Sequence, residues 1–314
     1  MSSQKFGVSV IAYFIVLALL AFTRAFGQAS AQAPTGGERD VVYGMYSGLA
    51  LLMDVHRPHT SNGYGIIYIA GSAFQAPMGY GATQLKEGRQ AQEYSKPLLD
   101  AGYTVFSINH RAAPRFRYPA AVEDAQRAVR YIRHNAAKFG ISPERIGASG
   151  GSSGALLVSL LGVLEGKGNS EDPDPVNRQS AKVQCVVLRA AAADYINVPP
   201  SSPAVNFLGM LIQGRSPASD EYKTYQEASP ISHVSHDDPP FLLIHGDSDE
   251  LVPFKHAELM EQAMKRAGVS VRLLRIEGGG HGPDFHGPGF RAEMDWPNYL
   301  AEMVRWFDQH LRKK

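Results

Sequence analysis

The chain has 314 residues, of which 44% are hydrophobic and 10% aromatic, so it can build a large buried core and need not be disordered. Its 31 lysines and arginines against 30 aspartates and glutamates leave no excess of charge, which argues against nucleic acid and anionic membrane surfaces as partners. The single cysteine, Cys185, excludes an intramolecular disulfide and a cysteine metal cluster.

The N-terminus differs from the rest of the chain. Lys5 precedes an uncharged apolar run over 6–22, and the small residues of QASAQA follow it. This pattern predicts a secretory signal peptide over 1–31. The alternative is an uncleaved membrane anchor, because the run approaches the ~20 residues that a membrane helix needs and Arg24 directly after it is unusual in a cleaved signal. Cleavage would leave 29 basic and 30 acidic residues. We therefore expect a nearly neutral protein, exported to a periplasm or the exterior, without stable membrane association.

From about Arg39 onward, short apolar runs alternate with longer segments of helical period. Runs bounded by Gly, Pro or Asp predict buried strands over 49–55, 65–70, 103–108, 145–149, 183–190, 240–246 and 271–277. Amphipathic segments predict helices over 121–140, 256–268 and 296–311, the first two ending at a glycine. This alternation predicts one α/β domain over 39–314, with a mostly parallel sheet covered by helices on both faces.

The stretch GASGGSSGA contains the pattern Gly-x-Ser-x-Gly twice, centred on Ser149 and on Ser152. A nucleophile elbow needs a strand, a sharp turn relieved by glycines, and then a helix. If Ser149 were the nucleophile, Gly150 and Gly151 would occupy the first helical turn, where helix formers are preferred. With Ser152, the strand extends to about Gly150 and an apolar helix follows the turn. We therefore predict Ser152 as the nucleophile. The alternative is a turn of small residues without chemistry.

A serine hydroxyl needs a base within hydrogen-bond reach and an acid that orients the base. In serine hydrolases with a parallel sheet, acid and histidine follow the serine along the chain, on loops after later strands. Asp247, Asp249 and Glu250 follow one predicted strand here, and His281 follows the next in a glycine-rich loop. His286 is a second candidate for the base. Position and order favour His281.

The chain resembles the α/β-hydrolase superfamily, in particular the hormone-sensitive-lipase-like and bacterial feruloyl-esterase-like carboxylesterases. The resemblance lies in the segments NHRAAPRFRYPAAVEDAQRAVRYIR, ISPERIGASGGSSGA, DDPPFLLIHGDSDELVPF and GGGHG. It implies the α/β-hydrolase fold over most of 41–311 and a serine hydrolase mechanism. In such relatives the second aspartate of HGDxD is the triad acid, which matches Asp249. Asp247 is then expected to brace the loop, and Glu123 and Asp124 are interpreted as structural.

The resemblance fails at one place. The relatives typically carry His-Gly-Gly-Gly and an aromatic residue after the third strand, where main-chain N–H groups form part of the oxyanion hole. This chain has AGSAF over 70–74. Backbone donors survive a side-chain change if the loop reaches its conformation, but Ser72 and Ala73 lack the freedom of glycine at positive φ. We predict the N–H of Ser153 as the first donor and that of Gly71 or Ser72 as the second.

The implied reaction is acyl transfer from an ester to water. His281 would take the proton of Ser152 as its hydroxyl attacks the carbonyl, while Asp249 holds the imidazole. No metal or organic cofactor is needed. His281, Asp284 and His286 could suggest a metal site, but two histidines and one carboxylate without a second cluster argue against it.

The segment 195–238 interrupts the alternation and is rich in Pro, Ser and Asn. We expect a lid-like insertion in which Phe207 and Leu211 wall the substrate pocket; a surface excursion without a role is the alternative. Phe74 and the loop 79–90 would close the other side. The expected substrate is a small-molecule or polysaccharide-linked ester, and the acyl group, the alcohol and the oligomeric state are not indicated.

Two other function classes stay open. A serine peptidase of the prolyl-oligopeptidase type shares the order of the triad, but such proteins usually carry a propeller domain for which this chain has no room. A non-catalytic binding protein of hydrolase shape is the second alternative, because the altered loop over 70–74 could have removed catalysis.

Overall fold

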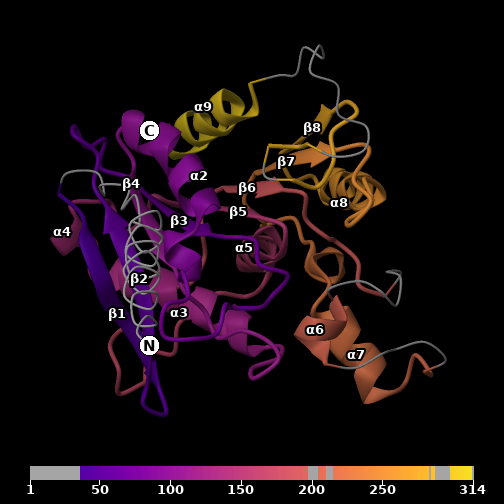
Figure 1. Cartoon of the computed structure of the whole chain (residues 1–314), viewed down its shortest axis with the longest axis horizontal. Coiled ribbons are helices and arrows are strands. Elements are labelled where there is room, and N and C mark those ends of the chain that lie inside the picture. The colour runs from indigo at the N-terminus through magenta and orange to yellow at the C-terminus, as the bar shows by residue number, and fades with distance from the viewer. Residues whose placement is uncertain (1–35, 197–203, 210–214, 283, 287–297, 313–314) are drawn as a thin grey trace, which may run out of the picture. The chain divides into compact units, whose positions relative to one another are not determined.

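Eight strands form one sheet in the order β1-β2-β4-β3-β5-β6-β7-β8 (Figure 1). The computed structural model describes residues 36–196, 204–209, 215–282, 284–286 and 298–312, so the predicted signal peptide lies outside it. The strands are β1 (Glu38–Tyr46), β2 (Leu49–His56), β3 (Gly65–Ile69), β4 (Thr104–Ile108), β5 (Ile146–Gly151), β6 (Val186–Arg189), β7 (Phe241–Gly246) and β8 (Val271–Ile276). β2 pairs antiparallel with both β1 and β4, and the other pairs are parallel. The mostly parallel sheet is confirmed.

The strand β1 was not predicted from the sequence. It pairs only with β2, and its register with β2 shifts twice. Several of its side chains are exposed, among them Val42, Met45 and Tyr46. An irregular edge strand of this kind carries neither a continuous apolar run nor a clean alternation, so the pattern that marks the buried strands is missing.

Helices cover both faces of the sheet. Apolar residues of α3, α5 and α8 share one core cluster with one set of strand side chains, and residues of α2 and α9 share another cluster with the opposite set. The helices of this domain in the described residues are α2 (Arg89–Asp100), α3 (Ala120–His134), α4 (Ala136–Phe139), α5 (Ser153–Val163), α8 (Lys255–Arg266) and α9 (Tyr299–Leu311), with a 3₁₀ turn η1 (Leu85–Glu87). The carboxyl ends of the parallel strands therefore meet at one edge between two helical layers.

Two helix predictions need correction. The predicted helix over 121–140 is interrupted at Asn135, so α3 and the short α4 are separate, and Gly140 ends the second at a φ of 67°. The expected loop over 79–90 contains η1 and the first residues of α2. The helix α2 has many polar residues and Pro97 inside it. These features hide its buried face, which is made by Ala91, Tyr94 and Leu98.

The interrupting segment contains secondary structure in its described parts. The elements are α6 (Ala204–Leu208), α7 (Asp220–Glu227) and the 3₁₀ turn η2 (Pro230–His233). Ser219 caps α7 by accepting a hydrogen bond from the N–H of Tyr222. Phe207 of α6 is 2% exposed and belongs to the core cluster shared with α3 and α5.

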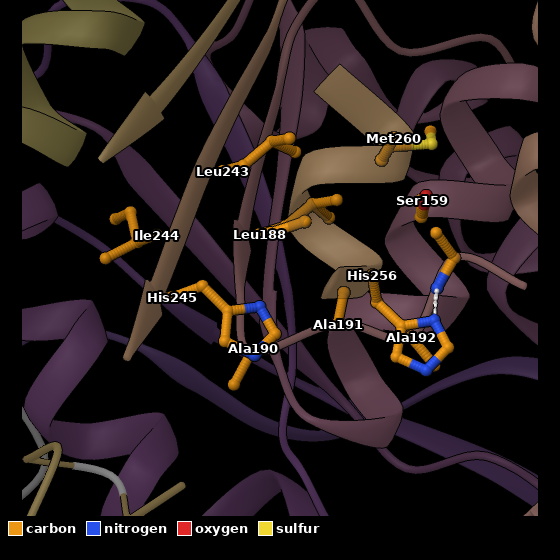
Figure 2. A pocket seen from close by; sticks show the side chains of 12 residues that line it. Ser159, Leu188, Ala190, Ala191, Ala192, Leu243, Ile244, His245, His256 and Met260 are labelled. Carbon is orange, nitrogen blue, oxygen red and sulfur yellow. Dashed lines mark hydrogen bonds between the residues drawn. The ribbon is translucent and has the colours of Figure 1, made fainter. Parts of the chain in front are cut away.

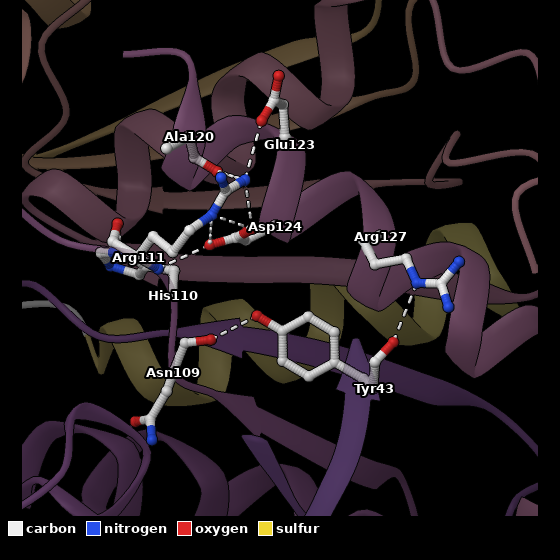
Figure 3. A network of polar contacts seen from close by, with 8 residues as sticks. All are labelled: Tyr43, Asn109, His110, Arg111, Ala120, Glu123, Asp124 and Arg127. Carbon is white, nitrogen blue, oxygen red and sulfur yellow. Dashed lines mark hydrogen bonds and ion pairs between the residues drawn. The ribbon is translucent and has the colours of Figure 1, made fainter. Parts of the chain in front are cut away.

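A buried ion pair fastens the segment after β4 to the start of α3 (Figure 3). Arg111 donates from Nε to Asp124 at 2.9 Å and from Nη2 to Glu123 at 2.8 Å, and its main-chain N–H donates to Asp124 at 2.6 Å. The ring centroid of Tyr46 lies 4.0 Å from the guanidinium carbon. Glu123 and Asp124 therefore have the structural contacts that the sequence interpretation assigned to them.

Candidate active site

Ser152 stands in the sharp turn between β5 and α5. Its φ of 53° and ψ of −122° are a strained conformation for a residue with a side chain. A Cβ atom on Gly154 would lie 2.0 Å from the carbonyl oxygen of Ile69, and one on Gly150 would lie 2.6 Å from the backbone of Gly154. Only glycine fits at both positions. Ser149 instead lies on β5, buried, with its Oγ 3.7 Å from the sulfur of Met303.

The structure brings Ser152, His281 and Asp249 together at the carboxyl edge of the sheet. Ser152 Oγ lies 2.8 Å from His281 Nε2, and His281 Nδ1 lies 2.8 Å from Asp249 Oδ2. The carboxylate can only accept, so Nδ1 carries the hydrogen and Nε2 is left to accept from the serine hydroxyl. The side chain of His281 is 20% exposed and that of Asp249 is fully buried. The imidazole is thus open to a reactant on one side and anchored on the other.

The carboxylate of Asp249 has four donors. The N–H groups of Leu251 and Val252 donate to Oδ1 at 3.0 and 2.8 Å, while His281 and His245 Nε2 contact Oδ2, the latter at 3.2 Å. Burial alone would raise the pKa of the Asp249 carboxyl, but the hydrogen bonds from the two histidines and from Val252 outweigh it and lower the pKa well below its ordinary value. Asp249 is therefore ionised at neutral pH.

His245, near the end of β7, was not singled out from the sequence. Its Nε2 lies 2.8 Å from the carbonyl oxygen of Val252 and 3.2 Å from Asp249, and both neighbours are acceptors, so this nitrogen carries a hydrogen. Figure 2 shows His245 and His256 beside a buried cavity. That cavity has a volume of about 10 Å³, which holds one water molecule at most. It is no substrate pocket.

The loop that carries His281 is braced as the sequence interpretation expected. Asp247 accepts from the N–H of Gly278 at 2.7 Å and pairs with Arg275 at 2.7 Å. His286 pairs with Asp284 at 2.7 Å. Among the residues that the structure describes, no group of three His, Cys, Asp or Glu side chains is arranged to hold a metal ion.

Arg189, the last residue of β6, is another functional candidate that the sequence analysis passed over. It is 2% exposed, and its Nη1 donates to the carbonyl oxygens of His281 and Gly282 at 2.9 and 3.0 Å. Its own carbonyl oxygen accepts from the N–H of Ser152 at 2.8 Å. The available signal was an arginine closing the apolar run VQCVVL, where a buried strand end favours an apolar residue.

The loop over 70–74 lies against the elbow, but two of its N–H groups already have acceptors. The N–H of Gly71 donates to Gln90 Oε1 at 3.1 Å, and that of Ser72 donates to Ser153 Oγ at 2.8 Å. A Cβ on Gly71 would lie 2.7 Å from the carbonyl oxygen of Gly151, so the two backbones touch. The oxyanion role of Gly71, Ser72 and the Ser153 N–H stays a prediction. In this conformation the first two N–H groups are satisfied within the protein.

A small cavity beside Ser152 is lined by Phe74, Leu156, Tyr195 and neighbouring residues and has a volume of about 20 Å³. Phe207 stacks on Phe74 with ring centroids 4.1 Å apart, so the insertion forms the wall behind Phe74. Leu211 lies outside the described residues. Ala73 and Phe74 both have positive φ, 52° and 63°, so this loop reaches its conformation without the glycines of the related motif.

The chain was compared with known proteins. The family model BD-FAE matches residues 53–264. The esterase LipQ of Mycobacterium tuberculosis is 30% identical over 192 residues, which cover 59% of this chain and 44% of LipQ. The probable carboxylic ester hydrolase LipM of the same organism is 29% identical over 240 residues, covering 74% of this chain and 54% of LipM. The matched region thus spans about half the length of these curated relatives.

Among solved structures, a truncated carbohydrate esterase from gut microbiota superimposes with a TM-score of 0.73 at 29% identity. The superposition covers 90% of this chain and 99% of that one. The fold therefore agrees over nearly the whole of both chains. Because the family model matches more than half of the sequence, and the sheet has the expected topology, the chain belongs to the BD-FAE family and has the α/β-hydrolase fold.

Proposed function

We propose that this protein is a carboxylic ester hydrolase in which Ser152 is the nucleophile, His281 the general base and Asp249 the acid that orients the base. The observation that carries the proposal is the continuous contact from Ser152 Oγ through His281 to Asp249, with 2.8 Å at each step. The names of the relatives LipQ and LipM support ester hydrolysis as the reaction.

The geometry suits acyl transfer to water. His281 Nε2 would accept the hydroxyl proton as Ser152 Oγ bonds to the ester carbonyl carbon, and would return that proton to the leaving alcohol. Asp249, ionised and held by four donors, would stabilise the imidazolium. Water activated by the same imidazole would then hydrolyse the acyl-enzyme. No cofactor takes part in these steps.

The acyl group is proposed to be short, with acetyl as the best fit. The cavity of about 20 Å³ beside Ser152 has room for a group about the size of a water molecule or a methyl. The stacked rings of Phe74 and Phe207 close it on one side. The alcohol side is proposed to be a carbohydrate, which the name of the structural relative supports. An aromatic acyl group such as feruloyl would not enter this cavity.

A panel of 4-nitrophenyl esters from acetate to octanoate, with an aromatic acyl ester added, tests the activity and the acyl size together. We expect the highest kcat/KM for acetate, and a loss of about 10⁴-fold or more in kcat for Ser152→Ala. The Phe207→Ala variant should move the optimum toward longer chains. Ser152→Ala activity equal to the wild type would refute the nucleophile, whereas a preference for octanoate would refute only the acyl size.

The peptidase alternative is tested in the same assay by adding peptidyl anilides. We expect no turnover of anilides by a preparation that hydrolyses acetate esters. Export is proposed from the sequence pattern over 1–31 alone. N-terminal sequencing of the native protein should find a start near residue 32. Recovery of the whole chain in the membrane fraction would instead support the uncleaved anchor.

A further inference from the structure

One residue contacts the backbone of both the proposed nucleophile and the proposed base. The main chain of Arg189 accepts the N–H of Ser152 at 2.8 Å. The side chain of the same residue donates from Nη1 to the carbonyl oxygens of His281 and Gly282 at 2.9 and 3.0 Å. Arg189 belongs to β6, in the middle of the parallel part of the sheet. It therefore connects the elbow and the histidine loop through a rigid element.

The guanidinium lies directly beneath the elbow. A Cβ on Gly151 would lie 2.9 Å from Nη2 and 3.1 Å from Nε of Arg189, so no side chain fits between them. The rings of Tyr94 and Phe285 flank the guanidinium carbon at 6.0 and 5.6 Å. Burial of a cation carries a large desolvation cost, and an apolar side chain would fill a strand end without it. The arginine thus has a cost that a purely packing role does not explain.

The histidine loop needs such a support. His281 follows Gly278, Gly279 and Gly280, which leave its backbone much conformational freedom in the absence of contacts. The forked, planar guanidinium can hold two successive carbonyl groups in one geometry, which a lysine ammonium on a flexible stem does not reproduce. Asp249 orients the ring of His281 but does not fix its backbone.

We propose that Arg189 is a positioning residue that sets the distance between Ser152 Oγ and His281 Nε2. This inference rests on the proposed function, since it assigns Arg189 to the same site. Arg189 does not touch the reacting atoms and acts through the backbone of the base. Displacement of a catalytic group by about 1 Å can lower the rate by about 10²-fold. Loss of the fork should therefore lower kcat more than it changes KM.

The chain offers a matched control. Arg133 of α3 is also buried, at 7% exposure, and also donates to backbone carbonyls, those of Pro143, Ser180 and Lys182. None of these residues belongs to the site. The variants Arg189→Lys, Arg189→Gln and Arg133→Lys each remove a buried carbonyl-binding arginine, so their cost to folding should be similar. They differ in what the arginine holds.

The test compares kcat and KM of these variants for 4-nitrophenyl acetate, together with their thermal unfolding. We expect Arg189→Lys and Arg189→Gln to lower kcat by about 10- to 100-fold with KM within about threefold of the wild type. Arg133→Lys should lower the Tm comparably and keep kcat. The inference is overturned if both Arg189 variants keep the wild-type kcat, or if Arg133→Lys loses as much kcat.

A second readout does not depend on turnover or on a variant folding well. In wild-type protein labelled with ¹⁵N-arginine, the Nη protons of Arg189 should give separate, slowly exchanging signals, because two carbonyl groups hold them. Averaged, rapidly exchanging signals would contradict the clamp. In Arg189→Lys, the His281 Nδ1 proton signal should shift or broaden, and it should stay unchanged in Arg133→Lys. An unchanged signal in both would also overturn the inference. Failure of the proposed function would appear separately, as a Ser152→Ala variant with wild-type activity.

Discussion

The two sides of Ser152 differ in how far their hydrogen bonds are arranged for chemistry. On the acid–base side, His281 faces the serine hydroxyl with its second nitrogen held by Asp249, and Asp249 has three further donors. On the oxyanion side, the N–H groups of Gly71 and Ser72 donate to Gln90 and Ser153 instead of facing a substrate position. One side is prearranged for proton transfer, while the other is closed upon the protein itself.

This difference indicates where substrate binding has work left to do. Preorganised groups need no rearrangement during the reaction, which is why they contribute most to rate. The acid–base side meets this condition without substrate. On the oxyanion side, a carbonyl oxygen must compete with Gln90 Oε1 and Ser153 Oγ, or receive its hydrogen bond from the Ser153 hydroxyl. Variants on the two sides should therefore behave differently.

The largest effect is expected on the acid–base side. Asp249→Asn replaces an acceptor with an amide that can donate to Nδ1, which favours the wrong tautomer of His281. We expect kcat for acetate esters to fall by about 10⁴-fold, with the protein still folded. Steady-state kinetics and circular dichroism check this. A fall of less than about tenfold would show that the prearranged carboxylate is dispensable.

On the oxyanion side, Ser153→Ala removes the hydroxyl that accepts the N–H of Ser72. We expect kcat to fall at least about tenfold, because the loop loses its tie to the elbow and the site loses a donor. Ser153→Thr, which keeps the hydroxyl, is the matched control. A rise in kcat for Ser153→Ala would reverse the interpretation, since it would mean that the hydroxyl blocks a working donor at Ser72.

A smaller effect is expected from the histidine behind the acid. His245→Phe keeps the aromatic volume but removes the N–H that contacts Asp249 Oδ2 and the carbonyl oxygen of Val252. We expect kcat to fall about tenfold with little change in KM, because the remaining donors still hold the carboxylate. His245→Gln, which can present an N–H at a similar place, should recover part of the loss. Equal activity of the two variants would assign His245 to packing alone.

The smallest effect concerns stability against pH. Because the folded-state pKa of Asp249 is lowered, its ionised form stabilises the fold at pH values above the ordinary value of 3.8. This contribution is lost as the pH falls from there through the lowered pKa. The difference in the free energy of unfolding between wild type and Asp249→Asn should thus be constant between about pH 5 and 7 and shrink below about pH 4. Ser153→Ala should show no such trend relative to wild type in urea denaturation.

Some parts of the site could be predicted from the sequence, and the reason is topological. Ser152, Asp249 and His281 each follow a buried apolar strand, and parallel strands bring their carboxyl ends to one edge. The two flanking glycines of Ser152 distinguish it from Ser149 because the elbow has no space for a Cβ there. These features are local in the sequence and recur wherever this fold carries a serine nucleophile.

Other parts depend on contacts that no local pattern encodes. The acceptor on Gly71 comes from Gln90, which lies on a helix that the polar sequence of α2 conceals. The clamp by Arg189 depends on the loop of His281, 92 residues away in the chain. The stacking of Phe207 on Phe74 joins the insertion to the oxyanion loop across the fold. Sequence spacing carries no information about which side chain fills such a gap.

The most direct test of the central claim is labelling with a fluorophosphonate probe, followed by peptide mapping. The account predicts one phosphonyl group per chain, attached to Ser152, and labelling slowed by about 10³-fold or more in His281→Ala. Labelling of another serine would contradict it, as would an unmodified Ser152 in a preparation that still hydrolyses acetate esters.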